Sequence, residues 1–159
     1  MVEFADTKDE AVFRIDVREF IEANAPQRDG EGFGFGGGGM TPAVRKAFEA
    51  WRDALVERGW IAPHWPEEWG GAGLTVKEQF ILNEELAEAG TGNVGGFGVM
   101  MLGPTLIVHG TEEQKEEHLS KILKGEVSWC QGWSEPGSGS DLASLQTRAV
   151  RDGDEFVIN

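Results

Sequence analysis

The spacing of apolar residues changes once along this chain, and the change limits the folds available to it. Up to about residue 125, apolar residues recur every three or four positions, as they do along one face of a helix. After that point, residues 146–151 and 155–159 alternate in the manner of strands, and Asp152-Gly153 between them is a hairpin turn signal. The chain is therefore expected to be helical first and to form a sheet later.

This order of elements predicts an α+β fold rather than alternating strand–helix–strand units. We expect a mostly helical N-terminal bundle followed by the first strands of an antiparallel β-domain. The expected domains are 1–125 and 126–159. Because the sequence stops inside a predicted strand, we interpret the second domain as incomplete and the chain as a fragment of a longer protein.

Helix boundaries are marked by recognisable end signals. Three predicted helices start with a capping box, in which a threonine hydroxyl and an acidic or amide side chain satisfy free backbone N–H groups: Thr7–Glu10, Thr75–Glu78 and Thr111–Gln114. A fourth helix starts at Thr41-Pro42, with proline in the first turn. Gly59 and Gly125 follow apolar stripes and are predicted left-handed stops.

Two further segments carry specific predictions. The uncharged stretch 93–109 predicts a helix that is apolar all round and therefore buried on every side, broken or restarted at Pro104. Residues 127–133 are β-like, and Cys130 within them is interpreted as an inert core thiol.

Charge and composition exclude several classes of function. The chain has 28 acidic against 14 basic side chains, a formal charge of -14, which argues against a sequence-independent nucleic-acid binder. The N-terminus lacks the features of a signal or transit peptide, and the uncharged run 89–111 is rich in glycine, so we expect a cytoplasmic protein without a membrane span. The three histidines lack ligand spacing, and no metal site is predicted.

Residues 134–141, Ser-Glu-Pro-Gly-Ser-Gly-Ser-Asp, are the segment with the clearest chemical potential. Gly137 and Gly139 permit a tight backbone turn whose N–H groups can converge on an anion. The segment lacks the third glycine of a dinucleotide fingerprint and the lysine of a P-loop. A polar loop with no ligand fits the same residues, so composition alone leaves both interpretations open.

The same segment, read with its surroundings, closely resembles the acyl-CoA dehydrogenase family of flavoenzymes. The residues that carry the resemblance are 129–141, Trp-Cys-Gln-Gly-Trp-Ser-Glu-Pro-Gly-Ser-Gly-Ser-Asp, together with 66–74, 103–104, 109–115 and 153–159. The family has an N-terminal helical domain, a middle β-domain and a C-terminal helical bundle. The resemblance implies FAD as cofactor and α,β-dehydrogenation of acyl-CoA thioesters to trans-2-enoyl-CoA.

The resemblance also implies roles for individual residues. Gln131 and Trp133 would contact the flavin edge through backbone atoms, and Ser134 would donate to the flavin ring. Gly139 and Ser140 would bind the FAD pyrophosphate, and Ser140 would also lie near the acyl-CoA substrate.

No catalytic residue is expected in this chain, because the family's base comes from the C-terminal bundle. Glu135 is interpreted as structural and Asp141 as a turn former. Acyl-CoA oxidases and flavin monooxygenases share much of this pattern, and a non-catalytic subunit of a heteromeric dehydrogenase is a further alternative. The implied partners are acyl-CoA, an electron-transfer flavoprotein or similar acceptor, and further full-length chains in a homotetramer, dimer or heteromer.

Glycines at 92–98 suggest one hypothesis about substrate size. The family lines its acyl pocket partly with this region, so low side-chain volume here would admit a bulky or branched acyl chain. Close helix packing explains the same glycines equally well, and the sequence does not decide between the two.

Overall fold

The structure is a computed structural model that describes residues 5–26, 41–91 and 94–159. Contacts divide the chain into two compact units, one ending at Trp129 and one comprising Cys130–Asn159. We call them the helical unit and the C-terminal unit. The division falls four residues after the predicted domain boundary. That the C-terminal unit is the start of a larger β-domain stays a prediction.

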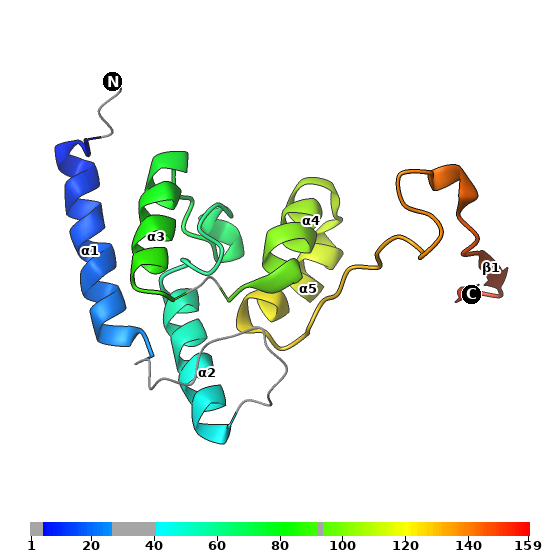
Figure 1. Ribbon diagram of the computed structural model, residues 1–159, viewed down its shortest axis with the longest axis horizontal. Helices are drawn as coiled ribbons and strands as arrows, with labels where there is room; N and C mark the ends of the chain where they lie inside the picture. Colours follow the sequence, from blue (N-terminus) through cyan, green and yellow to red (C-terminus); the bar gives the residue numbers. More distant parts are fainter. Residues whose placement is uncertain (1–4, 27–40, 92–93) are drawn as a thin grey trace. The chain divides into compact units, whose positions relative to one another are not determined.

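The predicted α+β fold class is confirmed (Figure 1). The helical unit contains α1 (Lys8–Asn24), α2 (Pro42–Glu57), the 3₁₀ turn η1 (Glu67–Trp69), α3 (Val76–Glu88), the π-helix η2 (Gly98–Leu102), α4 (Gly103–His109) and α5 (Glu112–Lys124). The C-terminal unit contains the 3₁₀ turn η3 (Leu142–Ser144) and the strands β1 (Ala149–Asp152) and β2 (Glu155–Ile158).

The predicted helix ends form as expected. All three capping boxes are complete, with the threonine oxygen accepting a backbone N–H and the side chain three residues later accepting the threonine N–H. Thr41 caps α2, and Pro42 lies in its first turn. Gly59 and Gly125 have φ values of 69° and 64°, in the left-handed region where glycine is favoured over residues with a Cβ atom.

The core of the helical unit is built around tryptophans and aliphatic residues from all the major helices. Trp51 and Leu55 of α2 are buried, and the ring of Phe20 packs edge-on against Trp60 at a centroid distance of 4.8 Å. Trp65 is also buried and donates its indole N–H to the carbonyl of Val99 at 3.2 Å. The aromatic segment 60–65, which follows α2, is therefore part of the core.

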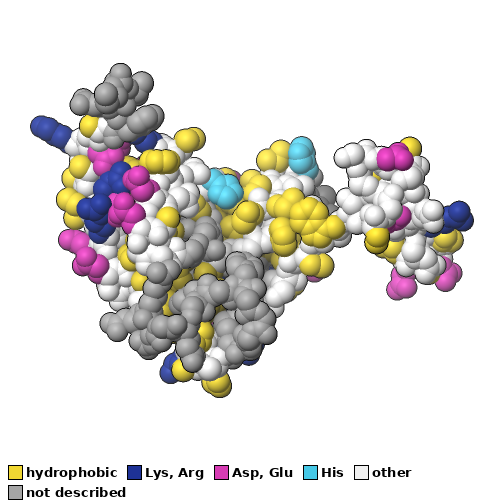
Figure 2. All heavy atoms as spheres, in the orientation of Figure 1, with side chains coloured by type: hydrophobic (Ala, Val, Ile, Leu, Met, Phe, Trp, Pro, Cys, Tyr) yellow, Lys and Arg dark blue, Asp and Glu magenta, His cyan; other side chains and the backbone are white. Residues whose placement is uncertain are grey.

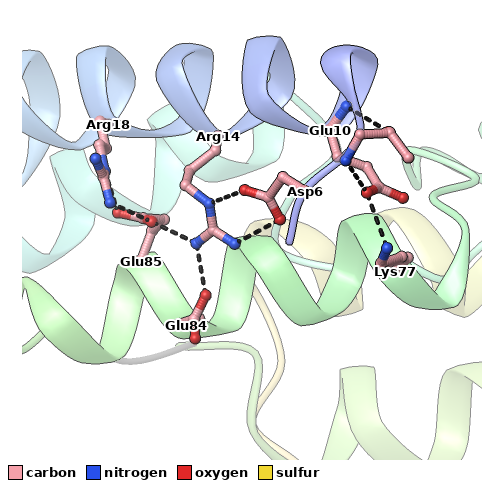
Figure 3. A network of polar contacts seen from close by, with 8 residues as sticks. Asp6, Glu10, Arg14, Arg18, Lys77, Glu84 and Glu85 are labelled. Atoms are coloured by element: carbon pink, nitrogen blue, oxygen red, sulfur yellow. Dashed lines mark hydrogen bonds and ion pairs between the residues drawn. The ribbon is translucent and has the colours of Figure 1, made fainter. Parts of the chain in front are cut away.

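A network of ion pairs fastens α1 to α3 (Figure 3). Glu85 of α3 is 4% exposed and accepts from Arg14 Nη1 at 2.7 Å and from Arg18 Nε at 2.7 Å. Arg14 also donates to Asp6 and to Glu84. The Arg18 hydrogen bond, followed by that of Arg14, holds the pKa of Glu85 below its ordinary value. Sequence reasoning did not identify this network, because its partners lie about 70 residues apart.

The stretch 93–109 is broken near Pro104 as predicted, but the prediction that it is buried on every side is wrong. The Gly103 N–H donates five residues back, to Gly98, and α4 restarts with proline in its first turn. Val99 faces the core, whereas Met100 is 67% exposed and Val108 is 70% exposed. Figure 2 shows hydrophobic side chains gathered on the surface over α4. One side of η2 and α4 packs against the core of the helical unit. The other side contacts no protein among the described residues.

The predicted strand at 127–133 is also wrong. Within the described residues, these positions are irregular, and Cys130 is exposed rather than a core thiol. A β-like sequence needs a neighbouring strand to supply backbone partners, and β1 and β2 pair only with each other. Their antiparallel register runs from Ala149 opposite Ile158 to Asp152 opposite Glu155, across a turn at Gly153 with φ of 62°.

Candidate cofactor-binding loop

The C-terminal unit contains a loop, residues 131–147, whose shape is fixed from within. The carboxylate of Glu135 accepts the backbone N–H of Gln146 at 3.0 Å and also that of Thr147. The side chain of Thr147, together with these N–H donors, lowers the pKa of Glu135. At neutral pH the Glu135 carboxylate is therefore ionised and engaged by the N–H groups of Gln146 and Thr147. This agrees with the structural role expected for it.

Two serines complete this internal framework. Ser138 is 2% exposed, and its hydroxyl donates to the carbonyl of Asp141 at 2.9 Å. Ser144 donates to the same carbonyl at 2.9 Å and to that of Gly137 at 3.3 Å. Asp141 thus shapes the turn through its backbone, and its side chain forms no capping bond to η3. Sequence reasoning did not assign these roles, because neither serine differs in sequence pattern from its neighbours.

The five residues predicted to contact FAD behave differently from this framework. No hydrogen bond to Gln131, Trp133, Ser134, Gly139 or Ser140 occurs within the described part of the chain. Gln131 is half-buried and the other four are exposed. The Trp133 side chain is 75% exposed, and a Cβ atom added at Gly139 would meet no atom within 4 Å.

These properties suit a planar, polar cofactor such as FAD. Ser134 and Ser140 offer free hydroxyl groups, Trp133 offers an exposed ring, and the bare backbone at Gly139 allows a phosphate to approach closely. The loop combines hydrogen-bond donors that have no partner among the described residues with a backbone held by internal hydrogen bonds. Its residues therefore fit the cofactor that the family resemblance implies.

A separate cavity of about 240 Å³ lies within the helical unit, beneath residues 94–98. A Cβ atom at Gly98 would lie 2.9 Å from Trp129 Cδ1, and one at Gly95 would lie 2.6 Å from Val99 Cβ, so these two glycines permit close packing. Gly96 has φ of 57° and open space beside it. Close packing thus accounts for two of the glycines linked to substrate size, whereas Gly92 lies outside the described residues.

Among the described residues, no group of three or more His, Cys, Asp or Glu side chains is arranged to hold a metal ion. No helix in the described ranges combines the length and the apolar character needed to cross a bilayer.

The fold defines an α+β protein with a helical N-terminal unit, and comparison with known proteins identifies the family. The profile of the acyl-CoA dehydrogenase N-terminal domain matches residues 7–126. Acyl-CoA dehydrogenase IpdE1 of Mycobacterium tuberculosis is 41% identical over 148 residues, covering 92% of this chain and 38% of that protein. The chain belongs to the acyl-CoA dehydrogenase family.

Solved structures support the same assignment. The Tcur3481-Tcur3483 steroid ACAD superposes with a TM-score of 0.71 at 39% identity, covering 99% of this chain and 39% of that chain. The ChsE4-ChsE5 complex from Mycobacterium tuberculosis gives a TM-score of 0.68 at 32% identity, covering 99% and 38%. The chain spans about two fifths of the length of these relatives.

Proposed function

We propose that this chain supplies the N-terminal helical domain and the flavin-contacting loop of an FAD-dependent acyl-CoA dehydrogenase. The observation that carries the proposal is that the loop 131–147 contains two sets of residues, one hydrogen-bonded within the loop and one not. Glu135, Ser138 and Ser144 hold its shape, while the five predicted cofactor residues leave their polar groups free. Family membership supplies the reaction class.

Bound FAD would supply the acceptor for the hydride that leaves the β-carbon of the acyl group. This chain would bind the cofactor and the thioester substrate and orient them. Ser134 would donate from its hydroxyl and backbone N–H to the ring edge, which would stabilise added electron density. Gly139 and Ser140 would hold the pyrophosphate, and Ser140 would also contact the thioester substrate.

The α-proton must pass to a base, and we assign no base within this chain. Glu135 is unsuitable because its carboxylate accepts two backbone N–H groups. Its lowered pKa also makes it a weaker base than an ordinary carboxylate. The base is therefore proposed to belong to a segment or subunit that joins this chain in the working enzyme.

Two of the similar solved structures favour a particular assembly and substrate. One is the Tcur3481-Tcur3483 steroid ACAD and the other is the ChsE4-ChsE5 complex. We therefore propose a bulky acyl-CoA thioester as substrate and a heteromeric assembly as the working form, with an electron-transfer flavoprotein or similar acceptor. A homotetramer, and an oxidase or monooxygenase activity, are the competing outcomes.

Anaerobic titration of the purified holoenzyme with acyl-CoA tests the reaction. We expect the flavin absorbance to bleach and trans-2-enoyl-CoA to form. Bleaching with bulky or branched thioesters should exceed that with linear medium-chain thioesters. A flavin band that no acyl-CoA bleaches would remove the dehydrogenase assignment, and a strict preference for linear chains would remove the substrate assignment.

A further inference from the structure

Arg52 of α2 is a largely buried cation that has no carboxylate partner in the part of the chain that the structure describes. Its side chain is 22% exposed, and its Nε atom is buried with no hydrogen-bond partner. Among the described residues, the only carboxylate within 4 Å is that of Asp53, whose Oδ1 lies 3.9 Å from Nε and whose side chain is 72% exposed. This separation is too long for a hydrogen bond.

Arg14 shows how the same unit normally treats such a side chain. It is 18% exposed, close to the value for Arg52, and donates to three carboxylates at 2.5–2.7 Å. Removing a guanidinium from water is costly unless an anion compensates it. Arg52, whose Nε atom is the buried and unpartnered part of its guanidinium, lacks the carboxylate partners that Arg14 has among the described residues.

The C-terminal end of α5 explains where the Arg52 guanidinium lies, but it accepts no hydrogen bond from that group. A Cβ atom at Gly125 would come within 2.4 Å of Arg52 Nη1, so the guanidinium rests against the C-terminal end of this helix. The partial negative charge of a helix C-terminus favours a cation there. No carbonyl in the described ranges accepts a hydrogen bond from Arg52, however, and its donors remain available.

Arg52 lines the 240 Å³ cavity, whose other walls are mainly apolar or glycine. Trp129 lines it too, and its indole Nε1 is a second buried donor without a partner. The apolar walls come from Phe48, Ile61, Val94, Phe97, Ile122 and Val127. An unpaired cation beside these apolar side chains is complementary to a ligand whose apolar part ends in an anion.

We propose that this cavity binds the carboxylate at the far end of an acyl group, with Arg52 as its cationic partner. The inference rests on the proposed function in taking the ligand to be an acyl-CoA thioester. A CoA phosphate is the other available anion, and the test below separates the two. The substrate class is therefore a CoA thioester with a carboxylate remote from the thioester.

The test compares two thioesters of equal chain length, one with a methyl end and one with a carboxylate end. The holoenzyme is prepared as wild type, Arg52→Gln, Arg52→Lys and Arg45→Gln, the last removing an exposed charge from the same helix. Arg52→Gln should lower kcat/KM for the carboxylated thioester about tenfold to a hundredfold. The value for the methyl-ended thioester should change less than twofold. Arg52→Lys should restore part of the loss, and Arg45→Gln should match wild type.

Equal losses on both thioesters would show that Arg52 is only structural and would overturn the proposal, as would no loss on either. Thioesters of dephospho-CoA separate the two anions. If the effect of Arg52→Gln disappears with them, the ligand is the CoA phosphate and the carboxylate assignment is wrong.

Binding is measured separately from turnover, using calorimetry with CoA thioethers of the same two chains. A Kd that Arg52→Gln weakens only for the carboxylated thioether supports the site even if no thioester bleaches the flavin. In that case the reaction assignment fails and the site stands. A Kd unaffected by Arg52→Gln, in an enzyme that still bleaches, leaves the reaction intact and removes the site.

Discussion

At the scale of single residues, Glu85 has the greatest expected effect on the stability of the helical unit. It is 4% exposed and bonds two arginines of α1, of which Arg18 is 54% exposed. Glu85→Ala should lower the free energy of unfolding by about 2 to 3 kcal/mol, between the values for exposed and buried ion pairs. Urea denaturation would measure this loss. Asp16→Asn, in an exposed pair with Arg58, should cost less than about 1 kcal/mol. Similar losses in the two variants would contradict the argument.

Glu85 also predicts a dependence of stability on pH. Its pKa is lower in the folded chain than its ordinary value of 4.5, mainly through the Arg18 hydrogen bond. The unfolded chain therefore binds more protons in the acid range, so stability rises with pH there. The contribution is complete above about pH 4.5 and is lost as the pH falls through the folded pKa. Unfolding between pH 3 and 7 should show a shallower acid loss for Glu85→Gln than for wild type. Parallel curves would exclude this role for Glu85.

At the scale of secondary-structure elements, the capping box of α3 is predicted to contribute measurably to the stability of the fold. Thr75 Oγ1 lies 2.6 Å from Glu78 Oε2 and accepts the Glu78 N–H at 3.3 Å. Thr75→Ala should cost about 1 kcal/mol, because free N–H groups in the first turn lose their partner. Thr75→Ser retains the hydroxyl and should retain most of the stability. Thermal unfolding followed by circular dichroism compares the two, and an alanine variant as stable as the serine variant would refute the prediction.

At the start of α4, adding a single methyl group is expected to cost more stability than the loss of the Thr75 cap. A Cβ atom at Gly103 would lie 1.8 Å from Trp65 Cζ2, so Gly103→Ala must displace a buried indole. We expect a loss of about 1 to 3 kcal/mol, as for other overpacked cores. Gly132→Ala, where a Cβ atom would meet nothing within 4 Å, is the matched control and should be nearly neutral. Guanidinium denaturation with Trp fluorescence measures both, and a neutral Gly103→Ala would show that the packing is looser than described.

These elements also show what the sequence could and could not predict. The helix ends were predictable because capping is local: Thr7 and Glu10 are three residues apart, and Gly125 immediately follows the stripe that it ends. Burial was less predictable, because it depends on what else surrounds an element. Met100 has the same apolar character as Val99, yet only Val99 faces the core.

In the candidate site, composition indicated a tight polar loop with or without a bound anion, and the family resemblance supplied the five cofactor residues, whose roles stay predictions. The sequence predicted neither the hydrogen bonds of Ser138 and Ser144 nor the isolation of Arg52. Each of these depends on which groups come together in space. Arg52 is not distinguished in the sequence from Arg14, whose carboxylates come from segments on both sides of it.

At the scale of the whole molecule, the 159-residue chain purified alone is expected to be inactive and to hold FAD poorly. It spans about two fifths of its relatives, and we assign it no catalytic base. Four of its five predicted cofactor residues are exposed in this chain, so the rest of a cofactor site is expected to come from elsewhere in the working enzyme. Mixing the chain with FAD, removing free cofactor by gel filtration and recording the flavin bands would test retention. Stoichiometric FAD together with turnover of an acyl-CoA would contradict the expectation.

The bond from Glu135 to the far side of its loop has a consequence for how this protein could be altered. Because the loop keeps its form through Glu135, Ser138 and Ser144, exchanges at Ser134 or Ser140 need not disturb the backbone that presents them. In the proposed enzyme, cofactor affinity and the electronic properties of the bound flavin would then be adjustable one hydroxyl at a time. An engineer could therefore retune the chemistry of the loop while leaving its architecture untouched.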